Sequence, residues 1–116
     1  MTRGEIWWAD FGIPFGSERG FQRPVLVVQD DAFNKSNIRT IVVLPFSTNL
    51  LFAEAPGNVF FGTESTGLSK DSVVVTSQIY SVDRARLIEK VCKLERRSVE
   101  EVEERMFTVL GLRSLG

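Results

Sequence analysis

The feature that most constrains this chain is a short apolar run, residues 25–28, which directly follows Pro24. Three valines and a leucine in succession are typical of a buried strand, because β-branched side chains pack well on a pleated surface. Pro24 has no backbone N–H and a fixed φ, so the chain must enter this strand in an extended conformation. Arg23, the residue before the proline, is therefore predicted to lie at the end of a rigid core strand.

Size and composition exclude several classes of protein. The chain has 116 residues, 43% of them hydrophobic and 25% charged, so we expect one globular domain over residues 1–116. The net charge of −1 argues against a nucleic-acid binder held by bulk positive charge. A single cysteine, Cys92, and the absence of histidine exclude a disulfide framework and the usual zinc ligand sets, which indicates a cytoplasmic protein without metal or cofactor. Neither a signal peptide nor a membrane span is expected.

The remaining pattern is one of short strands followed by a helix. Strands are expected over residues 3–11, 24–29, 39–46, 58–61, 73–75 and 86–94, and residues 76–83 are also expected to be extended. The last segment predicts a helix that begins with a capping box of Ser98 and Glu101 and ends at Gly111. This pattern predicts a mainly β fold, a small antiparallel barrel with an appended C-terminal helix.

Polar residues at the ends of two predicted strands are candidates for a site. Arg23 follows a glycine-bounded loop that also carries Glu18, and its planar, permanent charge suits a bound phosphate or carboxylate. An ion pair of Arg23 with Glu18 or Asp71, serving stability alone, is an equal alternative. Residues 47–49, Ser-Thr-Asn, follow another strand and could bind a ligand oxygen or form an ordinary turn.

Four blocks of sequence resemble the MazF/PemK family of toxin–antitoxin ribonucleases. They are Arg-Gly-Glu-Ile-Trp-Trp at residues 3–8, Gly-Ser-Glu at 16–18 with Arg-Pro-Val-Leu-Val-Val-Gln at 23–29, Leu-Pro-Phe-Ser-Thr-Asn-Leu at 44–50, and Gly-Leu-Ser-Lys-Asp-Ser at 67–72 with Gln-Ile at 78–79 and Val-Asp at 82–83. Each block alone is weak evidence. Four blocks in this order over nearly the whole chain form a strong resemblance.

The resemblance implies an SH3-like β-barrel of the CcdB/MazF type, a homodimer, a cognate antitoxin, and metal-independent cleavage of single-stranded RNA at short sequences. By position, Arg23 matches the family's active-site arginine, Ser47 a site usually held by threonine, and Glu18 the acidic residue of the Gly-Ser-Glu loop. The chain departs from the family where an acidic residue commonly precedes the glutamine. Because Val75 and Ser77 stand there, the Arg–Asp acid–base pair of one plasmid branch is excluded.

The resemblance also implies a mechanism, in which the ribose 2′-hydroxyl attacks the adjacent phosphorus and leaves a 2′,3′-cyclic phosphate and a 5′-hydroxyl end. Arg23 and the Ser47 hydroxyl would stabilise charge on the phosphoryl oxygens, and Glu18 would act as the base. Unpaired bases are read by aromatic stacking and by amide or backbone groups. The residues predicted to bind the substrate are Phe15, Phe21, Gln22, Thr48, Asn49 and Gln78.

Two other functions fit the same fold. A non-enzymatic toxin of the CcdB type would bind a topoisomerase, and it would need neither the loop from Glu18 to Arg23 nor Ser47. A catalytically inactive interaction module would keep the fold alone, and the changes at Val75 and Ser77 leave this alternative open.

Overall fold

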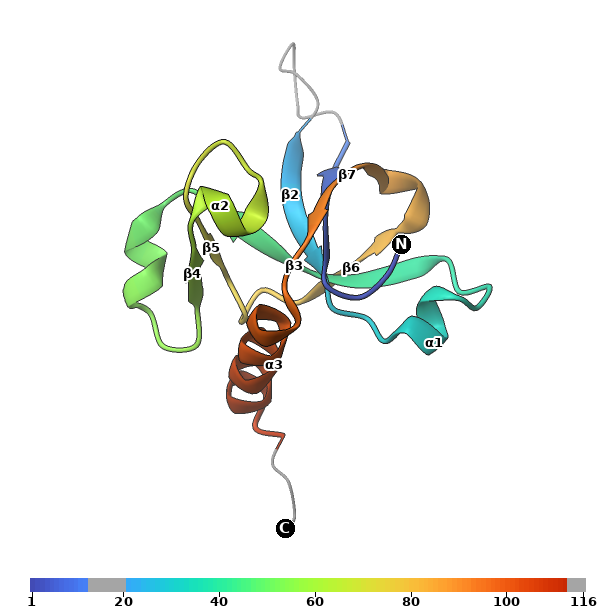
Figure 1. Ribbon diagram of the computed structural model, residues 1–116. Coiled ribbons are helices and arrows are strands. Elements are labelled where there is room, and N and C mark those ends of the chain that lie inside the picture. Colours follow the sequence, from blue (N-terminus) through green and yellow to red (C-terminus); the bar gives the residue numbers. More distant parts are fainter. Residues whose placement is uncertain (13–20, 113–116) are drawn as a thin grey trace.

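The computed structural model describes residues 1–12 and 21–112 (Figure 1), so the predicted site residues Phe15 and Glu18 lie outside the described residues. The strands are β1 (Glu5–Asp10), β2 (Gln22–Val27), β3 (Thr40–Ser47), β4 (Val59–Phe61), β5 (Ser72–Val74), β6 (Tyr80–Asp83) and β7 (Leu87–Lys93). The helices are α1 (Asp31–Asn34), α2 (Thr63–Thr66) and α3 (Arg96–Leu110), with 3-10 turns η1 (Leu50–Glu54) and η2 (Arg84–Arg86). None of the helices in these two ranges is long and apolar enough to cross a membrane.

The strands form a curled antiparallel sheet in the order β4-β5-β3-β2-β1-β7, and β6 pairs with β3 beside this path (Figure 1). β3 is the strand shared by both parts of the sheet. Along one edge it pairs with β2, and along the other it pairs first with β6 and then, at Phe46 and Ser47, with β5. The prediction of a mainly antiparallel β fold with a C-terminal helix is confirmed.

Alternation of side chains along the strands divides the core between the two faces of the sheet. Leu26, Leu44 and Phe46 belong to a cluster that also includes Val102 of α3. Val25 and Val27, their neighbours on β2, belong to the cluster on the other face, together with Ile41, Val43, Val82 and Leu87. Consecutive residues of β2 and β3 therefore point to opposite faces, which determines where Arg23 and Ser47 lie.

The helix α3 begins earlier than the sequence predicted. Its first residue is Arg96, and the residue before it, Glu95, makes no capping hydrogen bond with its side chain, so the predicted capping box at Ser98 is wrong. The Val99 amide donates to the Glu95 carbonyl at 3.1 Å, so the first helical turn closes before Ser98 can cap it. The predicted C-terminal cap is confirmed at Gly111, whose φ of 70° is left-handed.

A buried carboxylate is held at the start of β1. Glu5 is only 7% exposed. It accepts hydrogen bonds from the Thr2 amide at 3.0 Å, the Thr2 hydroxyl at 2.9 Å and the Trp7 indole at 2.9 Å, and it pairs with Lys90 at 3.2 Å. Burial acts to raise the pKa of Glu5, but these donors together outweigh it and lower the pKa to about 2.

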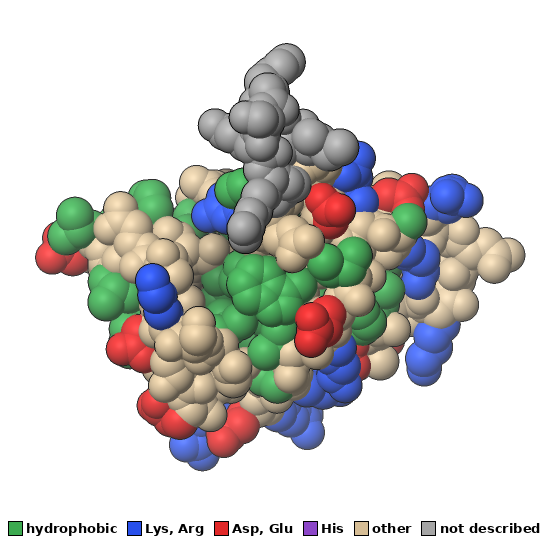
Figure 2. Space-filling view, turned by 90° about the horizontal axis from the view of Figure 1, so that it is seen from above, with side chains coloured by type: hydrophobic (Ala, Val, Ile, Leu, Met, Phe, Trp, Pro, Cys, Tyr) green, Lys and Arg blue, Asp and Glu red, His purple; other side chains and the backbone are tan. Residues whose placement is uncertain are grey.

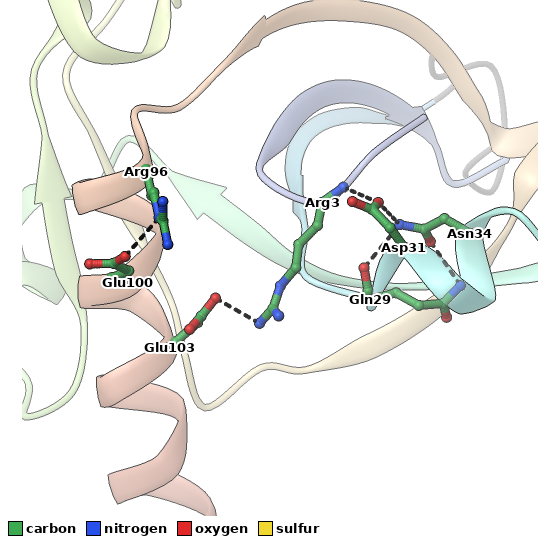
Figure 3. A network of polar contacts seen from close by, with 7 residues as sticks. All are labelled: Arg3, Gln29, Asp31, Asn34, Arg96, Glu100 and Glu103. Atoms are coloured by element: carbon green, nitrogen blue, oxygen red, sulfur yellow. Dashed lines mark hydrogen bonds and ion pairs between the residues drawn. The ribbon is translucent and has the colours of Figure 1, made fainter.

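Arg3 connects this end of the molecule to two helices (Figure 3). Its backbone amide donates to the Asp31 carboxylate of α1 at 2.8 Å, and its guanidinium pairs with Glu103 of α3 at 3.1 Å. The Asn34 side chain also donates to Asp31, at 3.0 Å. The hydrogen bonds from Asn34 and Arg3 lower the pKa of Asp31. Each charged side chain at this end thus has a charged partner or hydrogen-bond donor within the chain, although Nε of Arg3 is buried without a partner.

Candidate functional site

A groove of about 290 Å³ lies where β1 ends and β2 begins, lined by Phe11, Phe21, Arg23, Pro45, Gln78 and Tyr80. Three of these residues are aromatic, and the Phe11 ring centroid lies 5.8 Å from that of Phe21 and 5.6 Å from that of Tyr80. Figure 2 shows hydrophobic side chains gathered near the middle of the face seen from above, with charged side chains around them. The groove itself combines aromatic walls with one permanent positive charge.

Main-chain hydrogen bonds fix the two phenylalanines of the groove. The Phe11 amide donates to the Phe21 carbonyl at 2.8 Å, and the Phe21 amide donates to the Gly12 carbonyl at 2.9 Å. The β1–β2 ladder therefore continues to these residues, so both rings are held by strand pairing.

Three neighbouring strands bring the other groove residues to one face of the sheet. Pro45 lies opposite Val25, two residues from Arg23, and Tyr80 lies opposite Val43, two residues from Pro45. Residues two apart on a strand share a face. Arg23 of β2, Pro45 of β3 and Tyr80 of β6 therefore reach the same face, although they are far apart in sequence.

The Arg23 side chain is held loosely by the described residues. Its guanidinium lies over the Phe21 ring, 5.5 Å from the centroid, and Nη2 is 3.5 Å from the Phe46 carbonyl oxygen, at the long limit of a hydrogen bond. No carboxylate among residues 1–12 and 21–112 forms an ion pair with Arg23. Asp71, the described partner that the stability alternative requires, instead accepts a hydrogen bond from the Thr63 amide at 3.1 Å. Most donors of the guanidinium fork thus have no acceptor in the described part of the chain.

Ser47 ends β3 one residue after Phe46, whose carbonyl oxygen Arg23 approaches, and it is not among the residues that line the groove. Phe46 belongs to the core cluster beneath α3, so the alternation along β3 directs Ser47 to the opposite face, the face of Pro45 and Arg23. Ser47 is 8% exposed, and its oxygen accepts a hydrogen bond from the Asn49 amide at 3.1 Å. The ordinary turn that the sequence left open is therefore present, and it uses the Ser47 oxygen as an acceptor, so the hydroxyl can still donate.

Comparison with known proteins decides the family. A family model described as "PemK-like, MazF-like toxin of type II toxin-antitoxin system" matches residues 2–110. The chain belongs to this family. It is 37% identical over 112 residues to "Endoribonuclease MazF2" of Mycobacterium bovis, covering 97% of this chain and 98% of the relative. It is 33% identical over 112 residues to "Endoribonuclease EndoA" of Bacillus subtilis, covering 97% and 96%.

A solved structure shows the same MazF-type fold. It is described as an endoribonuclease in complex with its cognate antitoxin from Mycobacterial species, and it matches with a TM-score of 0.76 at 20% identity over 98% of both chains. At this identity the match shows the fold alone. The predicted CcdB/MazF type of fold is confirmed.

The predicted substrate residues of this MazF-family chain divide between the groove and other places. Phe21 and Gln78 line the groove with Arg23. Thr48 does not, because it lines a separate cavity of about 80 Å³ together with Trp8, Pro24, Leu68, Ser69, Lys70 and Ser72. Only part of the predicted substrate set is thus gathered around the arginine.

Asn49 and Gln22 also lie outside the groove. The Asn49 side chain accepts a hydrogen bond from the Leu51 amide at 3.2 Å and so caps η1, which is a structural role. Gln22 is exposed and adjoins Arg23 on β2, so the alternation directs it to the other face of the sheet. Strand alternation alone would have separated Gln22 from Arg23.

Sequence reasoning missed three groove residues, Phe11, Pro45 and Tyr80. Pro45 and Tyr80 could have been found only by aligning β3 with β2 and β6, because no local motif places them beside Arg23. Burial raises the pKa of the Tyr80 phenol, and the nearby charge of Arg23 acts in the opposite direction. The phenol is therefore neutral at physiological pH.

The positions at which the chain departs from the MazF family carry no carboxylate. Val75 is 3% exposed, and its amide donates to the Pro45 carbonyl at 3.1 Å, while Ser77 is exposed. Neither position can therefore supply a base, and Glu18, the acidic residue of the family motif, lies outside the described residues.

Proposed function

We propose that this protein is the toxin of a type II toxin–antitoxin system and cleaves single-stranded messenger RNA at short sequences in the groove around Arg23. The observation that carries the proposal is the Arg23 guanidinium, held at the end of a core strand in an aromatic groove without a described carboxylate partner. A planar, permanent cation in an aromatic groove suits a phosphodiester whose bases are unpaired. The names of the relatives, endoribonucleases, support the same activity.

The chemistry that we propose is transesterification within the substrate. The ribose 2′-oxygen forms a bond to the adjacent phosphorus as the bond to the 5′-oxygen breaks, giving a 2′,3′-cyclic phosphate and a 5′-hydroxyl end. Arg23 and the Ser47 hydroxyl stabilise the charge on the non-bridging oxygens, Glu18 takes the proton from the 2′-hydroxyl, and the departing 5′-oxygen takes a proton from water. Because the nucleophile belongs to the RNA, this reaction requires no metal-bound water.

Substrate binding extends the proposal to further residues. Phe21 and Gln78 contact the nucleotides beside the scissile phosphate, as their place in the groove supports. Thr48 acts in the separate cavity that it lines together with Lys70, which supplies a second positive charge. We also propose that the protein forms a homodimer in the cytoplasm and is bound by a cognate antitoxin. The structural relative that was solved in complex with its antitoxin supports the antitoxin partner.

The test is cleavage of defined single-stranded RNA by the purified protein in EDTA. We expect discrete cleavage sites, with cyclic phosphate and 5′-hydroxyl ends identified by mass spectrometry. Replacing Arg23 by alanine should lower the rate about 10²- to 10³-fold, because one charge-stabilising donor is lost.

Arg39 provides the matched control for this test. Its side chain is 82% exposed and lies at the start of β3, beside Asp83, so Arg39→Ala should leave cleavage unchanged. Intact RNA together with growth arrest in cells would favour the topoisomerase-binding alternative. Intact RNA without growth arrest would favour the inactive module.

A further inference from the structure

Phe11 and Tyr80 form an aromatic pair that the cleavage mechanism does not use. Their ring centroids lie 5.6 Å apart with the planes tilted by 53°, and both residues are half-buried. Phe11 packs in turn against Phe21, over which the Arg23 guanidinium lies. Three rings thus line the groove beside the positive charge.

We propose that Phe11 and Tyr80 stack on the nucleobase next to the phosphate held by Arg23 and set the base preference at that position. The inference rests on the proposed cleavage of RNA. Aromatic side chains bind unpaired bases through their faces, and a hydroxyl on one of the rings can hydrogen-bond the base edge. Phe11 supplies an aromatic ring alone, whereas Tyr80 supplies a ring and a hydroxyl.

The surroundings of Tyr80 suit a hydrogen bond between its hydroxyl and the edge of a base. Among the described residues, burial and the charge of Arg23 are the influences on the phenol, and no hydrogen bond to it is among them. Burial raises the pKa of Tyr80, so the hydroxyl keeps its proton and can donate to a carbonyl oxygen or ring nitrogen of a base. Gln78, which lines the same groove, offers an amide with both donors and an acceptor.

Strand pairing keeps both rings in place before any ligand arrives. The Phe11 amide bonds to the β2 side of the hairpin at 2.8 Å, and Tyr80 is the first residue of β6, opposite Val43. A side chain on a paired strand binds with less loss of conformational freedom than one on a long loop. The pair therefore acts as a preformed stacking surface for one base.

The test compares Tyr80→Leu, Tyr80→Phe and Phe11→Leu with the unmodified protein on a long single-stranded viral RNA. The 5′-hydroxyl ends are mapped to give the base frequencies around the cut, and KM and kcat are measured on an oligonucleotide carrying the preferred sequence. Tyr80→Leu should flatten the preference at one position beside the cut and raise KM about 5- to 150-fold. Tyr80→Phe should raise KM only about 2- to 10-fold, because the ring remains.

Controls separate this inference from a loss of folding and from the proposed function. Phe33→Leu changes an aromatic side chain that is 56% exposed on α1, away from the groove, and should alter neither KM nor the base preference. Thermal unfolding identifies any variant that fails to fold, and Tyr80→Phe keeps the packing of the ring. If Arg23→Ala abolishes cleavage while Tyr80→Leu and Phe11→Leu leave KM and base preference unchanged, the stacking surface is refuted and the nuclease stands. If the unmodified protein cleaves no RNA, both are refuted.

Discussion

Charged side chains at the two ends of the β1–β2 pair differ in the partners that they have within the chain. At one end Arg3 pairs with Glu103, and Glu5 accepts three hydrogen bonds and an ion pair, all from residues of the chain itself. At the other end Arg23 touches only an aromatic ring and a distant carbonyl oxygen among the described residues. The comparison indicates that charges at the first end contribute to stability, whereas Arg23 has no carboxylate partner in the described part of the chain.

Among the variants that compare the two ends, the largest effect should come from replacing each arginine by lysine, which keeps the positive charge. Arg23→Lys should lower RNA cleavage about 10²-fold, because the planar fork is lost, while the free energy of unfolding stays unchanged. Arg3→Lys should change neither quantity appreciably, since a lysine can still pair with Glu103. Cleavage rates and urea unfolding of both variants measure the contrast. Equal cleavage by the two variants would remove the distinction between the two ends.

Glu5 should matter for stability alone. Glu5→Gln removes the ion pair with Lys90 and one acceptor in a buried site, so the free energy of unfolding should fall by about 2 kcal/mol. The cleavage rate per folded molecule should not change, because Glu5 lies outside the groove. Urea unfolding at neutral pH, with cleavage assayed at a temperature where the variant is folded, checks both statements. A Glu5→Gln variant that is as stable as the unmodified protein but cleaves RNA more slowly would contradict a role of Glu5 in stability alone.

Low pH should reduce the stability that Glu5 contributes at the start of β1. The pKa of Glu5 is about 2 in the folded state, against an ordinary value of 4.5, so the folded state holds fewer protons than the unfolded state between these values. The stability from Glu5 is fully present above about pH 4.5 and is lost as the pH falls toward 2, with roughly 1–2 kcal/mol gone by pH 3. The lowered pKa of Asp31 adds a contribution of the same sign.

Thermal unfolding between pH 3 and pH 7 measures this loss. The Glu5→Gln variant serves as the reference, because it lacks the titrating group and should lose less stability on acidification than the unmodified protein. Parallel curves for the two proteins would show that Glu5 does not titrate as its surroundings indicate.

The smallest effect is expected for the partly exposed pair of Arg3 and Glu103, whose side chains are 32% and 33% exposed. Glu103→Gln should lower the free energy of unfolding by only about 0.5 kcal/mol, because water screens the pair. Added salt should reduce the difference further. Urea unfolding at low and high salt provides the measurement. A loss of unfolding free energy as large as that of Glu5→Gln would contradict the expectation that the exposed pair contributes less than Glu5.

Local pattern was sufficient for the central strands and for the end of the last helix. The valine-rich run after Pro24 became β2, and the β-branched run near residues 39–46 became its neighbour β3. Gly111 ends α3 as predicted, because a left-handed position after a helix favours glycine. The start of α3 was wrong because the helical hydrogen bonds begin at the Glu95 carbonyl, three residues before the best capping sequence. The single turn of α2 carries too few residues for a periodic signal.

The candidate site was only partly predictable, for a related reason. Arg23 and Ser47 could be named because each belongs to a motif, but the motif does not say what surrounds them. Tyr80 reaches Arg23 only through the pairing of β6 with β3, which is a long-range register. Conversely, Gln22 was named because it is near Arg23 in sequence, although alternation turns it away. Nearness along the chain is a poor guide to a groove built from three strands.

Pro45 has a consequence for how much of a base sequence the groove can encode. It lines the groove without an N–H, and among the six lining residues only Arg23, Gln78 and Tyr80 have side chains that can donate a hydrogen bond. With the arginine engaged by phosphate, an amide and a phenol remain for the bases. In the proposed function these two side chains can recognise about one or two bases. Recognition of a longer RNA sequence would need contacts outside these six residues.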